Sequence, residues 1–247
     1  MYTENIPKDA LLFAKAVFSN QLARFVPSFY VKLTHQTGRG YQEEDAAQIA
    51  DYYSRCFRDY IGQLNSVQET NVDRYLSAKR VLEYGPGDIL GVALLMYAHG
   101  VESVDCVDRF PLNKISEKNL DVYRIILESL KGKERARAEN AFNDRGQPES
   151  GFNPRAINYS VRPDGISAET KKYDLIISRA VLEHVNNLES TILDISNALK
   201  PGGVAIHEVD LKSHGLDRYQ AFDFLTWPEM FYKLMYGYKG FPNRWRV

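Results

Sequence analysis

The chain has 247 residues, of which 44% are hydrophobic, and this is enough for one large domain or for a domain with an appended subdomain. Its 31 Lys and Arg nearly cancel its 32 Asp and Glu, and this balance argues against a protein that binds nucleic acid mainly through phosphates. The two cysteines, Cys56 and Cys106, lie far apart in apolar surroundings. This excludes a disulfide framework and a thiolate metal site.

The N-terminal stretch and the apolar runs indicate neither an export signal nor a membrane span. No basic segment precedes the first apolar residues, and Asp9 and Lys15 interrupt them, which makes a poor signal peptide. The longest apolar run, VALLMYA at 92–98, is far shorter than the roughly 20 residues that a membrane helix needs. We therefore expect a soluble cytoplasmic protein that binds neither membrane nor nucleic acid.

The first part of the chain has the spacing of helices. Apolar residues from Leu11 to Phe25 recur at helical intervals, and Pro27 ends that pattern. A Gly-rich loop at 34–41 separates it from a second helical stretch at 43–64, which opens with acids and carries an aromatic and aliphatic stripe. These features predict a helical N-terminal region.

From residue 80 onward the pattern alternates between strand and helix. We expect strands at 80–84, 103–108, 155–161, 173–178 and 204–211, and helices at 88–98, 113–132 and 187–200. The polar stretch 143–154 is expected to be a mobile loop, and the PGG sequence at 201–203 a turn. Alternating strands and helices predict a Rossmann-like, mostly parallel α/β sheet with helices on both faces and right-handed crossovers. The expected domains are a helical lid region, 1–78, and this core, 79–247.

The stretch RVLEYGPGDILG at 80–91 follows the first strand, where parallel α/β sheets bind ligands. Gly85 and Gly87 lack side chains, so a ligand can approach the backbone closely. A dinucleotide would want a third glycine at Leu90, and its diphosphate would be repelled by Asp88 at the helix start. S-adenosylmethionine has no phosphate, and its cationic methionine portion suits Glu83 at the strand end. The loop therefore favours S-adenosylmethionine over NAD.

The second strand provides a further indication. It ends at Asp108, 21 residues after Gly87, where a carboxylate can accept hydrogen bonds from both hydroxyls of a ribose. Asp105 lies earlier in the same strand and is the weaker candidate. The alternative interpretation of Asp108 is an acid that only supports a turn.

With these motifs the chain resembles the class I S-adenosylmethionine-dependent methyltransferases over residues 80 to 210. The resemblance is carried by LEYGPG, VDCVD, YDLIISRAVLEHV and LKPGGVAIHEVD. It implies that the methionine portion is held by Glu83 and the loop Gly85, Pro86 and Gly87. It also implies that Asp108 binds the ribose, that Arg109 lies along the adenine, and that Ser178 and Arg179 line the cofactor cleft. We further expect Arg39, in the loop of the helical region, to reach the cofactor carboxylate.

The end of the chain departs from this family, whose sheet normally closes with two further strands, the last of them antiparallel. The residues after Asp210 have the pattern of a helix and an aromatic loop instead. Either those final strands are absent, or another chain covers the exposed edge of the sheet and produces an oligomer.

Methyl transfer to a hydroxyl needs a base, and histidine suits that task near neutral pH. His184 and His214 follow the fourth and fifth strands and are the candidates, although each could equally be a hydrogen-bonded structural residue. His99 is expected to cap a helix, and His207, in the middle of a strand, to be structural. Glu183 and Asp210 could converge with the two candidates, but their spacing forms no tight ligand set, so we expect no metal.

The expected function is therefore O-methylation of a saccharide or small-molecule hydroxyl with S-adenosylmethionine. The saccharide preference rests on HEVDLKSHG and the aromatic segments after it, which look like sequences of bacterial polysaccharide and natural-product methyltransferases. Trp227 and Trp245 would stack on a sugar, or equally well belong to a core. Two alternatives stay open: an inactive methyltransferase-like scaffold that binds a partner chain, and an NAD-dependent oxidoreductase.

Overall fold

The structure is a computed structural model of the chain, and it describes residues 6–34, 44–67, 75–185, 187–211 and 223–238. Arg39, His214 and Trp245, to which the sequence assigns roles, lie outside these residues.

A five-stranded parallel sheet, in the order β3-β2-β1-β4-β5, forms the centre of the described fold. Its strands are β1 Arg80–Tyr84, β2 Ser103–Asp108, β3 Ile157–Val161, β4 Tyr173–Arg179 and β5 Leu199–Glu208. The Rossmann-like α/β prediction is confirmed. The described residues add no antiparallel strand beyond β5, so β5 is an edge strand in this part of the chain.

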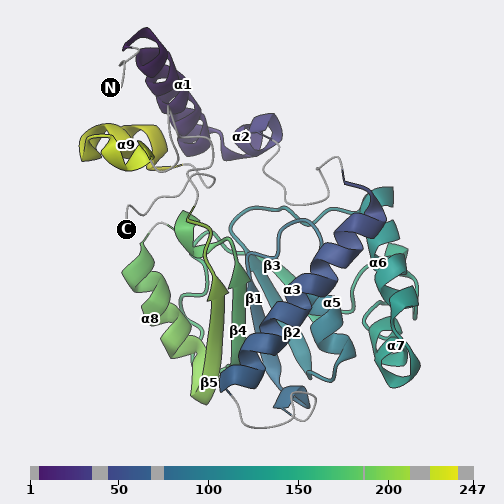
Figure 1. Cartoon of the computed structure of the whole chain (residues 1–247). Coiled ribbons are helices and arrows are strands. Elements are labelled where there is room, and N and C mark those ends of the chain that lie inside the picture. The colour runs from purple at the N-terminus through teal and green to yellow at the C-terminus, as the bar shows by residue number, and fades with distance from the viewer. Residues whose placement is uncertain (1–5, 35–43, 68–74, 186, 212–222, 239–247) are drawn as a thin grey trace. The chain divides into compact units, whose positions relative to one another are not determined.

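Helices cover the sheet because their apolar sides face it. The helices are α3 Ala46–Val67, α5 Gly91–Ala98, α6 Glu117–Ser129, α7 Gly132–Glu139 and α8 Leu188–Ala198. Figure 1 shows α3 crossing one face of the sheet and α8 lying beside β5. Buried residues of α3, α5 and α6 join those of the strands in one core, which includes Ile49, Leu64, Leu94 and Ile126.

The structure corrects two of the expected boundaries. The PGG sequence falls inside β5, which begins at Leu199, five residues before the expected start at 204. The stretch 143–154 is folded: it contains the 3-10 helix η2, Pro148–Ser150, and Phe152 stacks on Phe142 with ring centroids 4.8 Å apart. Aromatic burial thus orders a segment whose polar residues had suggested a mobile loop.

The chain divides into two compact units. One comprises 37–179 and 189–208 and contains the sheet with α3. The other comprises 1–36, 180–188 and 209–247 and contains α1 Ile6–Phe25, α2 Pro27–Thr34, η3 Leu182–His184, η4 Asp223–Thr226 and α9 Glu229–Tyr236. These bounds differ from the expected division at residue 78, because α3 packs on α5 and α6 of the sheet unit.

In the helical unit, α1 packs on α9. The buried side chains at this contact are Ala16, Trp227, Tyr232, Met235 and Tyr236. Asn20 of α1 forms hydrogen bonds to α9 and the residues just after it. Its Nδ2 donates to the Leu234 carbonyl at 2.8 Å, and its Oδ1 accepts from the backbone amide of Tyr238 at 2.8 Å. Within the described residues, no helix is long and apolar enough to cross a membrane.

Candidate functional site

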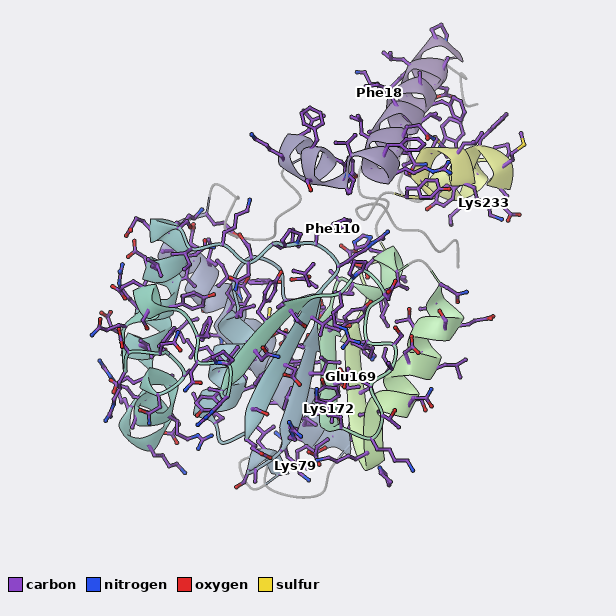
Figure 2. The ribbon with its side chains drawn as sticks, turned by 180° about the vertical axis from the view of Figure 1, so that it is seen from behind. Phe18, Lys79, Phe110, Glu169, Lys172 and Lys233 are labelled. Atoms are coloured by element: carbon purple, nitrogen blue, oxygen red, sulfur yellow. The ribbon has the colours of Figure 1, made fainter. Side chains whose placement is uncertain are left out.

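All five strands are parallel and therefore end at the same edge of the sheet. Four predicted site residues lie at these ends, namely Glu83 in β1, Asp108 in β2, and Ser178 and Arg179 in β4. Figure 2 shows Phe110, two residues after Asp108, at this edge and Lys79, just before β1, at the opposite edge. The topology thus brings together residues that are almost a hundred positions apart in the sequence.

The loop after β1 needs its glycines for its backbone shape. Gly85 and Gly87 have φ angles of 73° and 79°, in the left-handed region that side chains disfavour. The Gly85 amide donates to the Val107 carbonyl at 2.8 Å, and the Gly87 amide donates to Oδ2 of Asp108 at 3.2 Å. These bonds bend the loop, including Pro86, over the end of β2. They also place the predicted methionine-binding loop against the predicted ribose-binding acid.

Glu83 and Asp108 are buried carboxyl groups with raised pKa values. Burial, followed by repulsion from Asp108, raises the pKa of Glu83 to about 8. Burial also raises the pKa of Asp108 to about 7, although a hydrogen bond from Tyr159 and the one from Gly87 oppose the shift. Oε2 of Glu83 is buried and has no hydrogen-bond partner among the residues described. A cation at this position would relieve the repulsion between the two carboxylates.

Asp105, the weaker ribose candidate, already has partners. Its Oδ1 accepts from the Asn158 amide at 3.1 Å, and its Oδ2 accepts from the Tyr173 hydroxyl at 2.9 Å and lies 3.0 Å from Nζ of Lys172. The carboxylate therefore links β2, β3 and β4. Its hydrogen bonds leave less capacity for a ligand than those of Asp108.

Arg109 lies next to Asp108 and is also partly buried. Burial lowers the pKa of its guanidinium, and the nearby Tyr84 opposes this shift. The guanidinium carbon lies 5.3 Å from the ring centroid of Phe110, and Nη1 is buried without a hydrogen-bond partner in the described part of the chain. A buried donor of this kind favours a ligand that supplies an acceptor.

Ser178 and Arg179 end β4 and make different contacts. The hydroxyl of Ser178 lies 2.7 Å from Nδ1 of His207 in β5. The guanidinium of Arg179 pairs with Asp59 of α3 at 3.2 Å and with Glu208 of β5 at 2.8 Å. A cavity of about 560 Å³ lies beside this ion-pair group, and its lining includes Arg58, Gln63, Ile206 and His207.

Two tyrosines of α3 lie close to the cofactor loop, and the sequence predicted only a helical stripe for them. Tyr60 is buried, and its pKa is raised by burial and by repulsion from Glu83. Tyr53 packs so tightly that a Cβ added to Gly91 would lie 2.5 Å from its ring. Gly91 therefore allows α5 to begin against α3, and this explains a glycine that is out of register for a dinucleotide site.

Of the two predicted catalytic histidines, His184 belongs to the helical unit, and His214 lies outside the described residues. His184 is in η3 of the helical unit, where its Nε2 lies 3.8 Å from Oε1 of the buried Glu183. The same Glu183 oxygen accepts from the Asp210 amide at 3.2 Å. His99 is the C-cap of α5 and stacks on Phe57, which agrees with its expected structural role.

The described residues include no group of three or more His, Cys, Asp and Glu side chains arranged to hold a metal ion.

A family model for methyltransferase domains matches residues 41–236. The chain therefore belongs to the methyltransferase domain family, and the resemblance to class I S-adenosylmethionine-dependent methyltransferases is confirmed. No curated protein matches.

Several solved structures are similar to this chain over part of their length. A protein from Galdieria sulphuraria, assigned as a sarcosine dimethylglycine methyltransferase, is 18% identical with a TM-score of 0.42, over 77% of this chain and 61% of that one. A protein from Listeria monocytogenes, assigned as an S-adenosylmethionine-dependent methyltransferase, is 17% identical with a TM-score of 0.37, over 66% and 63%. An S-adenosylmethionine-dependent methyltransferase from Mesorhizobium loti is 18% identical with a TM-score of 0.33, over 55% and 50%. The matched region of this chain thus covers between half and two thirds of the length of these relatives.

S-adenosylmethionine is the cofactor that the family implies, and the site has features that fit it. The two glycines give the loop a backbone that a ligand can approach. The buried oxygen of Glu83 suits an ammonium group, and the raised pKa values of Glu83 and Asp108 suit a cationic ligand.

Proposed function

We propose that the protein transfers a methyl group from S-adenosylmethionine to a hydroxyl oxygen of a saccharide or another small molecule. Family membership supports the methyl transfer. The observation that carries the cofactor assignment is the pair of buried carboxyls at the ends of β1 and β2, whose pKa values are raised mainly by burial. A cationic cofactor would favour their ionised forms, whereas a neutral or anionic ligand would not.

Each residue of the site then has a distinct task. Glu83 accepts a hydrogen bond from the ammonium of the methionine portion, and the backbone from Gly85 to Gly87 lies against that portion. Asp108, already fixed by the Gly87 amide, accepts from the ribose hydroxyls. Arg109 lies along the adenine. S-adenosylmethionine supplies an activated methyl group, so positioning accounts for much of the rate.

The acceptor half of the proposal rests on sequence segments at the end of β5 and after it. Trp227 is buried against α1, with its ring 6.4 Å from that of Phe13, so it belongs to the core of the helical unit and does not argue for a sugar. The preference for an oxygen acceptor rests on the segment HEVDLKSHG and on the need for a histidine base. The proposal includes no nucleic-acid or membrane partner. It does include an oligomer that forms through the edge of β5.

Calorimetry tests the cofactor half. We expect S-adenosylmethionine and S-adenosylhomocysteine to bind, and NAD to give no heat. Binding of NAD alone would favour the oxidoreductase alternative. Binding of none of the three would favour the inactive scaffold.

Alanine variants test the two histidines named from sequence. Replacing the true base should lower single-turnover methyl transfer by roughly 10² to 10⁴ and leave cofactor affinity almost unchanged. His184→Ala and His214→Ala are to be compared for turnover and for melting temperature, because loss of a structural histidine lowers stability and not turnover per folded molecule. Full turnover in both variants would exclude both as the base.

A further inference from the structure

His207, which the sequence suggested to be structural, has an unusual hydrogen-bonding state. Its Nδ1 lies 2.7 Å from the hydroxyl of Ser178, whose side chain is buried. Its Nε2 is buried and has no hydrogen-bond partner among the residues that the structure describes. A purely structural histidine in a sheet would be expected to satisfy both ring nitrogens, because leaving one unsatisfied costs about 1–3 kcal/mol.

The position of His207 places it at the functional edge of the sheet. Tyr84, Ser178 and His207 are register partners across β1, β4 and β5. Neighbouring strands lie about 4.8 Å apart, so the backbone of His207 is about 10 Å from that of Tyr84, which precedes the cofactor loop. Register partners also project to the same face, so the imidazole and the Ser178 hydroxyl lie on the face of Tyr84.

The Ser178 contact can fix the tautomer of the imidazole. If Nδ1 carries the proton and donates to the Ser178 hydroxyl oxygen, Nε2 keeps a free lone pair and can accept a proton. Burial lowers the pKa of His207, which keeps the ring neutral near pH 7. A neutral imidazole held by a hydrogen bond at one nitrogen is the arrangement that a general base needs.

A solute can approach this end of β5. The consecutive residues Ile206, His207 and Glu208 line the cavity of about 560 Å³ together with Arg179 of β4 and a segment of α3 that includes Arg58 and Gln63. The other described histidine of the sheet unit, His99, follows α5 and precedes β2, and therefore lies near the opposite edge. Among the described histidines of this unit, His207 alone lies at the edge of the cofactor loop.

We propose that Nε2 of His207 accepts the proton of the acceptor hydroxyl and that Ser178 orients the imidazole. This inference rests on the proposed function. The acceptor oxygen forms a bond to the methyl carbon while the bond from that carbon to sulfur breaks, with its electron pair remaining on sulfur. The hydroxyl proton moves to Nε2 and is later released to water, so that charge and atoms balance. S-adenosylhomocysteine and the methyl ether are the products.

The first test needs no acceptor. In the full-length protein labelled with ¹⁵N-histidine and saturated with S-adenosylhomocysteine, nitrogen chemical shifts report the tautomer of His207, assigned by comparison with His207→Asn. We expect the proton on Nδ1. A proton on Nε2 would overturn the proposal, because Nε2 would then be a donor.

The second test separates a base from a structural residue. His207→Asn preserves a polar group near the Nδ1 position and removes Nε2, whereas His207→Ala removes both, and His99→Gln is a control histidine outside the site. Methyl transfer is measured in single turnover with methyl glycosides of glucose, mannose and rhamnose and with catechol. We expect His207→Asn to lose roughly 10² to 10⁴ in rate while its affinity for S-adenosylhomocysteine stays within about twofold. Ser178→Ala should lose less, and His99→Gln should keep the wild-type rate.

The outcomes distinguish the two proposals. A wild-type rate in His207→Asn would overturn the base role, even if His207→Ala were unstable. If the wild-type protein binds S-adenosylmethionine but methylates no hydroxyl compound, the O-methylation proposal fails, and the role of His207 fails with it.

Discussion

Glu83 and Asp108 are the residues whose charge we expect to affect cofactor binding. Both carboxyls are protonated in part near neutral pH, because burial raises their pKa values to about 8 and about 7. S-adenosylmethionine carries a net positive charge and therefore favours the ionised carboxylates. Its binding should release protons.

We therefore predict that the affinity for S-adenosylmethionine rises between about pH 6 and pH 8 and then levels, by at most about tenfold per pH unit for each proton released. Calorimetry across this range in buffers of different ionisation enthalpy would measure both the affinity and the protons released. Glu83→Gln should bind more weakly and lose the upper part of the pH dependence. An affinity for the wild-type protein that does not change with pH would contradict the raised pKa values.

The same shift predicts the stability of the protein without cofactor. The pKa of Glu83 is higher in the folded state than the ordinary value of 4.5, so the folded protein holds a proton that the unfolded chain has released. Stability from this group is therefore fully present below about pH 4.5 and is lost as the pH rises to about 8. Urea unfolding should show a smaller loss across this range in Glu83→Gln than in the wild-type protein.

Asp108 and Asp105 form a matched pair for testing the ribose contact. We predict that Asp108→Ala weakens binding of S-adenosylhomocysteine by about 1.5 to 3 kcal/mol, the usual loss for charge-assisted hydrogen bonds. Asp105→Ala should lower the unfolding free energy, because Tyr173, Lys172 and Asn158 lose their shared partner, but should leave affinity unchanged. The opposite pattern in calorimetry and urea unfolding would assign the ribose contact to Asp105.

At the residue scale, the sequence predicted what depends on local order and missed what depends on contacts across strands. Glu83 and Asp108 lie at the ends of β1 and β2, and Gly85 and Gly87 lie in the loop after β1, as the local sequence pattern predicted. The contact between Ser178 and His207 was not, because it depends on the register between β4 and β5. Periodicity places an alternating residue on a face but does not identify its neighbour in the next strand.

The elements were predictable wherever a strong apolar pattern ended at a polar or turn-forming residue. β1 and β2 have the predicted bounds. The helix expected at 113–132 is shorter in the structure, because α6 begins only after Ser116, whose hydroxyl accepts from the Asn119 amide, and ends at Ser129. The fold of 143–154 was not predicted, because its order comes from Phe142 and Phe152 at the two ends of a polar stretch. Long-range aromatic packing carries no local periodic signal.

The packing of α3 on α5 gives a prediction at this scale. Gly91→Ala would place a Cβ 2.5 to 2.9 Å from side-chain atoms of Tyr53, and such overpacking should lower the unfolding free energy by about 1 to 3 kcal/mol. Gly62→Ala is the matched control, because nothing lies within 4 Å of an added Cβ in the middle of α3. It should stabilise the protein by about 0.5 to 1 kcal/mol. Equal effects of the two changes in urea unfolding would show that the close contact with Tyr53 does not limit packing.

At the scale of the whole molecule, the division of the chain into two units raises the question of how cofactor binding couples them. Residues after β4 and β5 belong to the helical unit, together with α1, α2 and α9. The chain therefore passes into the helical unit after β4, returns to the sheet unit at residue 189, and enters the helical unit again after β5. The sequence indicated this connectivity only by a change from alternating strands and helices to helical periodicity alone. That change did not reveal that α3 packs with the sheet.

We predict that the N-terminal helical region acts as a lid that closes when the cofactor binds, with Arg39 contacting the cofactor carboxylate. A lid excludes water and completes the site, so its backbone amides should exchange more slowly in the closed state. Hydrogen exchange read by mass spectrometry should show greater protection of residues 6–41 with S-adenosylhomocysteine than without it. Residues 117–129 of α6 provide an internal reference, because they belong to the sheet unit.

Arg39→Ala should weaken the affinity for S-adenosylhomocysteine and reduce the added protection of 34–41, whereas Arg55→Ala, which changes an exposed arginine of α3, should do neither. Equal exchange of 6–41 with and without ligand would exclude the lid, and protection that persists in Arg39→Ala would show that the lid closes without this contact.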